Sequence, residues 1–154
     1  MAKYSIDTSS ILHAWRRSYP PNSFPSLWQN IEELINRGDL IATEAVLFEL
    51  EPKDDEVYKW AKSRIQMFVS IDERIQEFVA EIMRDYPNLV DYRRMRSAAD
   101  PFVIALAKIE NCSVVTNENV SVNPEKPKIP NVCRAMGILS ISFLELISEQ
   151  AWKF

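Results

Sequence analysis

The chain has 154 residues, of which 47% are hydrophobic and 26% are charged; this is an ordinary globular composition, and the length favours one domain over residues 1–154. No apolar run approaches the roughly 18 to 20 residues that cross a bilayer. The start of the sequence also lacks the apolar core of a signal peptide, so we expect a cytoplasmic protein with no membrane segment. The net charge of −4 argues against a protein that coats nucleic acid by bulk electrostatics. It does not exclude an enzyme that gathers carboxylates around a cation.

Strand and helix signals alternate from the start of the chain. Short apolar runs predict strands at 3–7 and 40–42, and helical spacing predicts helices at 9–17, 25–37 and 44–51. Gly38 and Pro52 stand where the second and third of these helices should end. Thr43 is a suitable N-cap for the third helix. This order of elements is typical of a parallel sheet with crossover helices.

The alternation continues to the C-terminus. A helix that starts at 54–56 carries an apolar stripe as far as Phe68, and Ser70-Ile71-Asp72-Glu73 resembles a capping box for the next helix. Asp100 stands before a proline and is the expected N-cap of a helix that is apolar almost all round, and therefore buried. Further strands are predicted at 113–116 and 138–141, and further helices around 132–136 and at 143–149.

The nitrogen and sulfur ligands are few. Cys112 and Cys133 are the only cysteines, which is too few for a disulfide framework or a four-ligand zinc site, and their apolar neighbours predict buried free thiols. His13 is the only histidine. Any bound metal would therefore be held by oxygen, which favours Mg²⁺ or Mn²⁺.

Four carboxylates stand at comparable places in the predicted fold. Asp7 and Glu118 lie at or just beyond strand ends, and Glu49 and Asp100 lie on helices next to strands. Ligands bind outside the carboxyl ends of strands in open α/β sheets. Four such groups would repel one another unless a divalent cation neutralised them. Two-metal phosphodiesterases use carboxylate clusters of this kind.

Each carboxylate also has a purely structural interpretation. Asp100 alone could be a helix N-cap, worth about 1 kcal/mol. Glu49 could be a solvent-facing member of an amphipathic helix, and Glu118 a loop residue without a role. Asp7 fits such an interpretation least well, because a carboxylate that ends a buried strand usually has a partner. The hydroxyls of Thr8 and Ser9, next in the chain, are candidates to support it.

The chain resembles PIN-domain nucleases of the VapC toxin type over nearly its whole length. Four stretches match in order and separation, of which the first and third are the more specific: Tyr4-Ser5-Ile6-Asp7-Thr8-Ser9, Ala45-Val46-Leu47-Phe48-Glu49-Leu50, Ala99-Asp100-Pro101-Phe102-Val103-Ile104-Ala105-Leu106-Ala107 and Val114-Val115-Thr116-Asn117-Glu118. The resemblance implies a three-layer α/β/α sandwich around a mainly parallel sheet of four to five strands.

The resemblance also implies a function. It suggests an endoribonuclease that depends on Mg²⁺ or Mn²⁺, often a toxin blocked by an antitoxin partner. Carried over by motif, Asp7, Glu49 and Asp100 are metal-site acids, while Thr116, beside Asn117, is the polar residue that orients the site. The family commonly has Asp where this chain has Glu118. That departure, and the proline-containing loop after it, indicate a divergent branch.

Basic residues supply a candidate RNA contact. Arg93, Arg94 and Arg96 cluster just before Asp100, where they could bind phosphates beside the acidic site. The alternative is a solvated surface segment. No sequence feature resembles a dedicated RNA-binding module, so groove shape and these few cations would select the substrate.

Two other function classes share features with this sequence. Glu118 and its altered loop favour a PIN-like module that binds RNA or protein but has lost catalysis. A phosphatase of the haloacid dehalogenase type also begins with Asp after the first strand, but it needs a second Asp two positions on, where this chain has Ser9. The RNA target and the oligomeric state, including a homodimer, stay open.

Overall fold

A computed structural model describes residues 2–94 and 97–154. These residues form a five-stranded sheet in the order β3-β2-β1-β4-β5. Every neighbouring pair is parallel, as the alternating pattern predicted. The strands are β1 (Tyr4–Ile6), β2 (Leu40–Thr43), β3 (Phe68–Val69), β4 (Ser113–Val115) and β5 (Ser140–Ile141).

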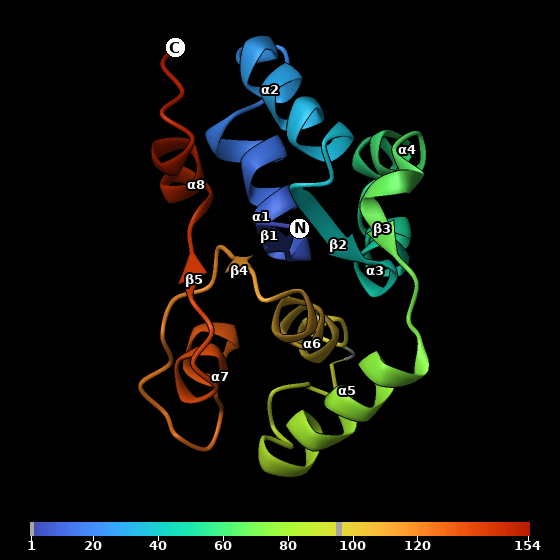
Figure 1. Cartoon of the computed structure of the whole chain (residues 1–154), viewed down its shortest axis with the longest axis vertical. Coiled ribbons are helices and arrows are strands. Elements are labelled where there is room, and N and C mark those ends of the chain that lie inside the picture. The colour runs from blue at the N-terminus through green and yellow to red at the C-terminus, as the bar shows by residue number, and fades with distance from the viewer. Residues whose placement is uncertain (1, 95–96) are drawn as a thin grey trace.

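Helices cover both faces of the sheet (Figure 1). On one side lie α1 (Thr8–His13), the π-helical turn η1 (Ala14–Ser18), α2 (Pro25–Asn36) and α8 (Phe143–Glu149), and on the other lie α5 (Glu73–Asp85), α6 (Asp100–Glu110) and α7 (Ile129–Ala135). The helices α3 (Glu44–Lys53) and α4 (Asp55–Lys62) and the 3₁₀ turn η2 (Ile65–Met67) connect β2 to β3. The layers are therefore helix, sheet and helix.

The core lies between these layers. Within α6 the side chains of Val103, Ile104 and Ala105 are fully buried, which confirms that this helix is apolar because it packs against the sheet. The strands β1 and β2 are buried along their whole length, as expected for a parallel sheet covered on both faces. A parallel sheet of this kind exposes side chains mainly beyond its strand ends, where a site can form.

Several helix ends differ from the sequence-based prediction. Pro52 lies inside α3, because a proline in the last turn leaves only one backbone bond unmade. Asp72, not Ser70, is the N-cap of α5 and accepts from Ile75 N–H. The stripe that reached Phe68 does not form one helix, since α4 ends at Lys62 and Phe68 begins the unpredicted strand β3. Thr43 caps α3 as predicted.

The two cysteines, both predicted to be buried, differ in their burial. Cys133 is buried, but Cys112 is only half-buried, because it stands in the turn that follows α6. Burial raises the pKa of both thiols to about 12.

Among the described residues, no helix has the length and apolar character needed to span a bilayer.

Candidate active site

Asp7 and Thr116 follow directly after the paired strands β1 and β4, in which Ile6 lies opposite Val115. Because the strands are parallel, both residues emerge at the same edge of the sheet. The Thr116 hydroxyl donates a 2.6 Å hydrogen bond to Oδ2 of Asp7. The structure thus brings together two predicted site residues that are 109 positions apart.

Asp7 is held on several sides. Its Oδ1 accepts from Ser10 N–H at 2.7 Å, which caps α1, and its Oδ2 also accepts from the Ser9 hydroxyl at 2.9 Å. The residue is 1% exposed. Burial raises the pKa of its carboxyl to about 7, although the bonds from Thr116 and Ser10 act to lower it and the charge of Glu118 adds to the rise. Asp7 is therefore a rigid, desolvated carboxyl group.

Glu49 reaches the same region from α3. Its Oε1 accepts from the Thr8 hydroxyl at 2.6 Å and lies 3.9 Å from Lys53 Nζ, while its Oε2 accepts from Ala99 N–H at 3.1 Å. Glu49 consequently links the start of α1 to the residue just before Asp100. The interpretation of Glu49 as a solvent-facing helix residue is wrong, because these contacts draw its side chain inward.

Asp100 is the first residue of α6 and is 7% exposed. The prediction that it is the N-cap is wrong: Ala99 holds that position, and no side chain caps the helix. The Asp100 N–H donates to the Ser97 carbonyl at 3.0 Å, within the turn that precedes α6. Burial raises the pKa of its carboxyl, and the charges of Glu118, Asp7 and Glu49 raise it further.

Glu118 stands in the loop after β4 and is half-buried. Its backbone N–H donates to Thr116 Oγ1 at 3.1 Å, and its Oε2 accepts from Ile129 N–H at 3.1 Å. Burial raises the pKa of its carboxyl, whereas the bond from Ile129 and the charge of Lys128 act in the opposite direction. Glu118 is therefore anchored to both β4 and α7, unlike a free loop carboxylate.

The four carboxylates interact electrostatically, because the charges of the other three all raise the pKa of Asp100. They do not form a ready coordination shell. Within residues 2–94 and 97–154, no group of three or more His, Cys, Asp or Glu side chains is arranged to hold a metal ion. Both glutamates are engaged by backbone N–H groups, Ala99 for Glu49 and Ile129 for Glu118.

The supporting polar residues are also placed. Thr8, Ser9 and Thr116 each hydrogen-bond one of the carboxylates directly. Asn117 is exposed and contributes its backbone N–H, at 3.4 Å from Ser9 Oγ. A cavity of about 250 Å³ opens beside Thr116 and Glu118 and extends to the start of α8. A larger cleft of about 450 Å³ lies at the opposite, amino-terminal edge of the strands, beside Lys3, and is separate from the carboxylates.

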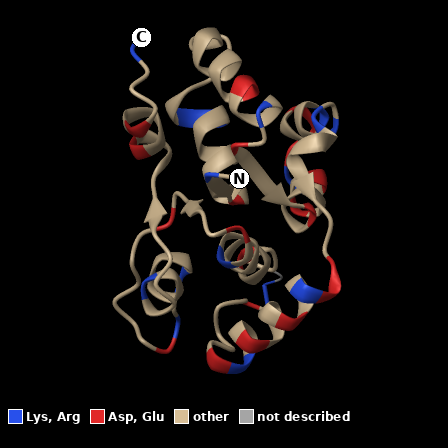
Figure 2. Ribbon diagram, in the orientation of Figure 1, with Lys and Arg blue, Asp and Glu red and all other residues tan. Residues whose placement is uncertain are grey.

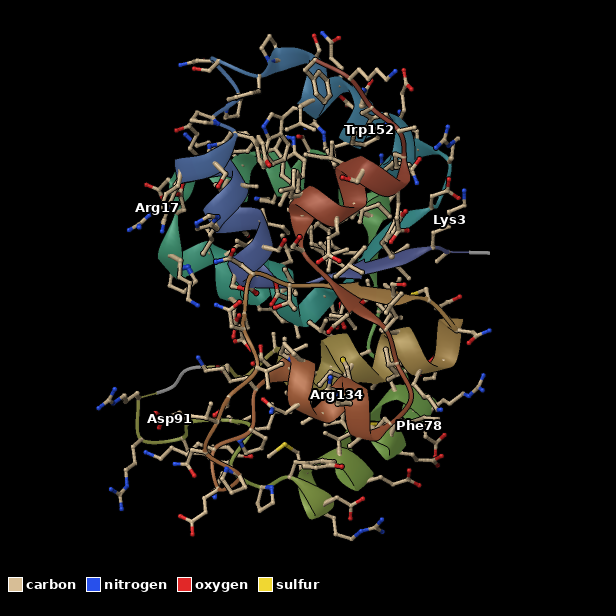
Figure 3. The ribbon with its side chains drawn as sticks, turned by 90° about the vertical axis from the view of Figure 1, so that its left-hand side faces the viewer. Lys3, Arg17, Phe78, Asp91, Arg134 and Trp152 are labelled. Carbon is tan, nitrogen blue, oxygen red and sulfur yellow. The ribbon has the colours of Figure 1, made fainter. Side chains whose placement is uncertain are left out.

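Two of the predicted RNA-binding arginines lie on the loop between α5 and α6. Arg93 and Arg94 are exposed, and Nε of Arg94 lies 4.0 Å from Oδ2 of Asp91. Arg96 lies outside the described residues. Figure 3 shows Lys3 where the chain enters β1, and Asp91 on the projecting loop at the other side of the molecule. Figure 2 shows charges of both signs along α5, without a uniformly basic helix.

Sequence reasoning missed several residues of the site. The backbone N–H groups of Ala99 and Ile129 leave no sequence signal, because any residue except proline supplies one. Lys53 could have been found, since it stands four positions after Glu49 and such pairs are neighbours on a helix. Ser10 contributes through its backbone, while its buried hydroxyl has no hydrogen-bond partner among the described residues.

Known structures identify the architecture. The chain resembles a chain in the crystal structure of VapBC2 from Rickettsia felis bound to a DNA fragment from their promoter, with a TM-score of 0.55 and 15% sequence identity. The match covers 91% of this chain and 98% of that one. The protein therefore has the PIN-like fold, a three-layer sandwich around a parallel sheet, as predicted.

The sequence comparison then gives the family. Residues 4–154 match the model of a family described as a domain of unknown function (DUF4411), and the chain belongs to that family. No curated protein sequence matches the chain.

Proposed function

We propose that this protein is a metal-dependent endoribonuclease, the toxin of a toxin–antitoxin pair. The observation that carries the proposal is the gathering of Asp7, Glu49, Asp100 and Glu118 at the carboxyl ends of β1 and β4. The PIN-like fold supports it, as does the likeness to a chain of a VapBC2 complex. That neighbour is also the reason to propose an antitoxin partner for this chain.

The chemistry of the donor groups fits Mg²⁺ or Mn²⁺. Carboxylate oxygens are the ligands that these hard cations favour. Asp7 and Asp100 are buried carboxyls whose pKa values are raised, and a nearby cation would favour their charged forms. When bound, such an ion activates water and stabilises the leaving oxygen of a phosphodiester. Thr116 and Ser9 hold Asp7 in a fixed orientation, and Thr8 does the same for Glu49.

The substrate would reach the site past the arginine-bearing loop. Arg93 and Arg94 are exposed there, and we include Arg96 from the sequence. Guanidinium groups bind phosphates well, so this loop would hold the RNA backbone near the carboxylates. With few base-reading groups available, we expect the cleavage site to depend on RNA shape and strandedness.

A second candidate is a PIN-like module that binds RNA or protein without cleaving it. The absence of a ready coordination group among the described residues favours this alternative, as does the engagement of both glutamates by backbone donors. In this case the carboxylates would serve as a rigid polar surface. The two candidates differ in whether Mn²⁺ binds at Asp7 and Asp100.

The experiment compares Mn²⁺-dependent cleavage of single-stranded and structured RNA by the wild type, Asp7→Asn and Asp100→Asn. We expect cleavage by the wild type and a loss of at least 100-fold in each variant. Asp85→Asn is the matched control, because Asp85 is exposed at the end of α5. Equal cleavage by all four proteins would contradict the proposal. If calorimetry detects no Mn²⁺ binding that depends on Asp7 and Asp100, and no RNA is cleaved, the result would favour the binding module.

A further inference from the structure

The side chain of Asn131 ties together the two halves of the loop between β4 and α7. Its Oδ1 accepts from Ser121 N–H at 2.9 Å and from Lys128 N–H at 3.0 Å, and its Nδ2 donates to the Ser121 carbonyl at 3.0 Å. These three bonds tie the outgoing half of the loop, at Ser121, to the returning half, at Lys128. Asn131 itself is half-buried in the first turn of α7.

Glu118 depends on the same junction. Its carboxylate binds Ile129 N–H, the residue next to Lys128, and its backbone binds Thr116 at the end of β4. The position of the Glu118 carboxylate is therefore set by how the start of α7 lies against residues 118–121. Asn131 holds this relationship independently of the Glu118 carboxylate, because its three bonds join Ser121 to Lys128. An ordered loop also spares the entropy that a free loop would lose when a ligand orders it.

Glu118 itself also bonds across the loop, whereas the side chains of two other described asparagines make bonds only at its tip. Asn123 accepts from Glu125 N–H at 3.0 Å, a local bond within the exposed tip. Asn88, in the segment between α5 and α6, donates to the Glu125 carbonyl at 2.8 Å, again at the tip. Asn131 alone among these three binds backbone in both halves of the loop, at Ser121 and at Lys128.

We infer that Asn131 is a positioning residue for the metal site, acting through Glu118; the inference rests on the proposed function. An asparagine suits this task because one compact side chain supplies both an acceptor and a donor without adding charge. Groups that orient metal ligands typically change metal affinity by 10- to 100-fold when removed. We therefore expect Asn131 to affect Mn²⁺ affinity although its side chain bonds only backbone groups.

The test is a double-mutant cycle on Mn²⁺ affinity, measured by calorimetry. Asn131→Ala should weaken binding about tenfold in the wild type, and should have no further effect in Glu118→Ala, whose binding is already weakened. Asn123→Ala, an equal truncation at the loop tip, should bind as the wild type does. If Asn131→Ala destabilises the fold, Asn131→Ser carries the same expectation, because its hydroxyl is too short to reach both Ser121 and Lys128.

The outcomes separate the inference from the proposed function. The role of Asn131 would be overturned if the Asn131 variants bind Mn²⁺ as tightly as the wild type. It would also be overturned if Asn131→Ala weakens Mn²⁺ binding equally with and without Glu118. Either result would leave the proposed function standing. If the wild type binds no Mn²⁺, or if Asp7→Asn binds it equally well, the proposed metal site itself fails and the inference falls with it.

Discussion

The hydroxyl of Thr116 and the carboxylate of Asp7 form a 2.6 Å hydrogen bond that joins the carboxyl ends of β1 and β4. The same hydroxyl oxygen accepts from Glu118 N–H. One threonine thus orients Asp7 and also fixes the start of the loop that carries Glu118. Since both partners of Thr116 belong to the proposed metal site, its removal should affect stability and metal binding together.

Replacement of Thr116 tests this relationship. Thr116→Val keeps the shape of the side chain but leaves a buried Asp7 oxygen without this donor, so we expect the free energy of unfolding to fall by about 1–3 kcal/mol. The pKa of Asp7 should rise further, because the Thr116 bond lowers it. Urea unfolding measures the first effect. Thr116→Ser is the control, and equal stability of the two variants would contradict the assignment.

The stability of the metal-free protein should fall as the pH rises from about 4 to 7. In this window the Asp7 carboxyl is protonated in the folded state, with a pKa of about 7, but ionised in the unfolded chain, whose pKa is about 3.9. The folded state binds more protons, so the free energy of unfolding decreases with pH, by on the order of a few kcal/mol.

The measurement compares wild type and Asp7→Asn by urea unfolding at pH 5 and pH 8 without divalent ions. The wild type should lose more stability than the variant over this interval, and Mn²⁺ should restore more at pH 8. Asp54 does not interfere, because its pKa is lowered and its contribution is lost only below about pH 4. The same pH dependence in both proteins would be the opposing result.

Neutralising Asp100 should stabilise the metal-free protein. Burial and the charges of three other carboxylates oppose ionisation of Asp100 in the folded protein, whereas the group ionises freely in the unfolded chain at pH 8. Asp100→Asn removes this cost of folding at nearly constant volume. At pH 8 we expect an increase of about 1 kcal/mol or more, with loss of the rise in Tm that Mn²⁺ produces in the wild type. Thermal unfolding checks both effects, and Asp85→Asn, at an exposed position, should show neither. A less stable Asp100→Asn at pH 8 would argue against a raised pKa for Asp100 in this pocket.

The arginines of the loop between α5 and α6 should contribute to RNA binding through their charge alone. Arg93→Ala with Arg94→Ala should weaken RNA binding and reduce the slope of log affinity against log salt by about 0.7 for each lost phosphate contact with single strands. The assay is a salt titration without divalent ions. Arg37→Ala is the matched control, because Arg37 is exposed and lies at the opposite, amino-terminal edge of the sheet. It pairs there with Asp39, whose backbone carbonyl accepts from Tyr4 N–H in β1. An equal change in Arg37→Ala would assign binding to net charge.

The pattern of residues along the chain was sufficient for the order of elements. Apolar spacing and end signals placed α8 at its observed bounds and α2 within one residue at its C-terminus. These signals act over a few positions, because helix periodicity, capping and proline geometry involve neighbouring residues. The same locality explains two errors. Pro52 is tolerated in the last turn of α3, and Phe68 joins β3 because it pairs with Ala42 of β2.

The arrangement of the site was decided only by the tertiary structure. Asp7 and Asp100 could be singled out in the sequence, but their approach to Glu49 and Glu118 depends on contacts between residues up to 109 positions apart. The backbone donors Ala99 and Ile129, and the junction at Asn131, have no sequence pattern of their own. Parallel pairing of β1 with β4 brings these distant groups to one edge, and a long-range pairing of this kind depends on the free energy of the whole packed chain.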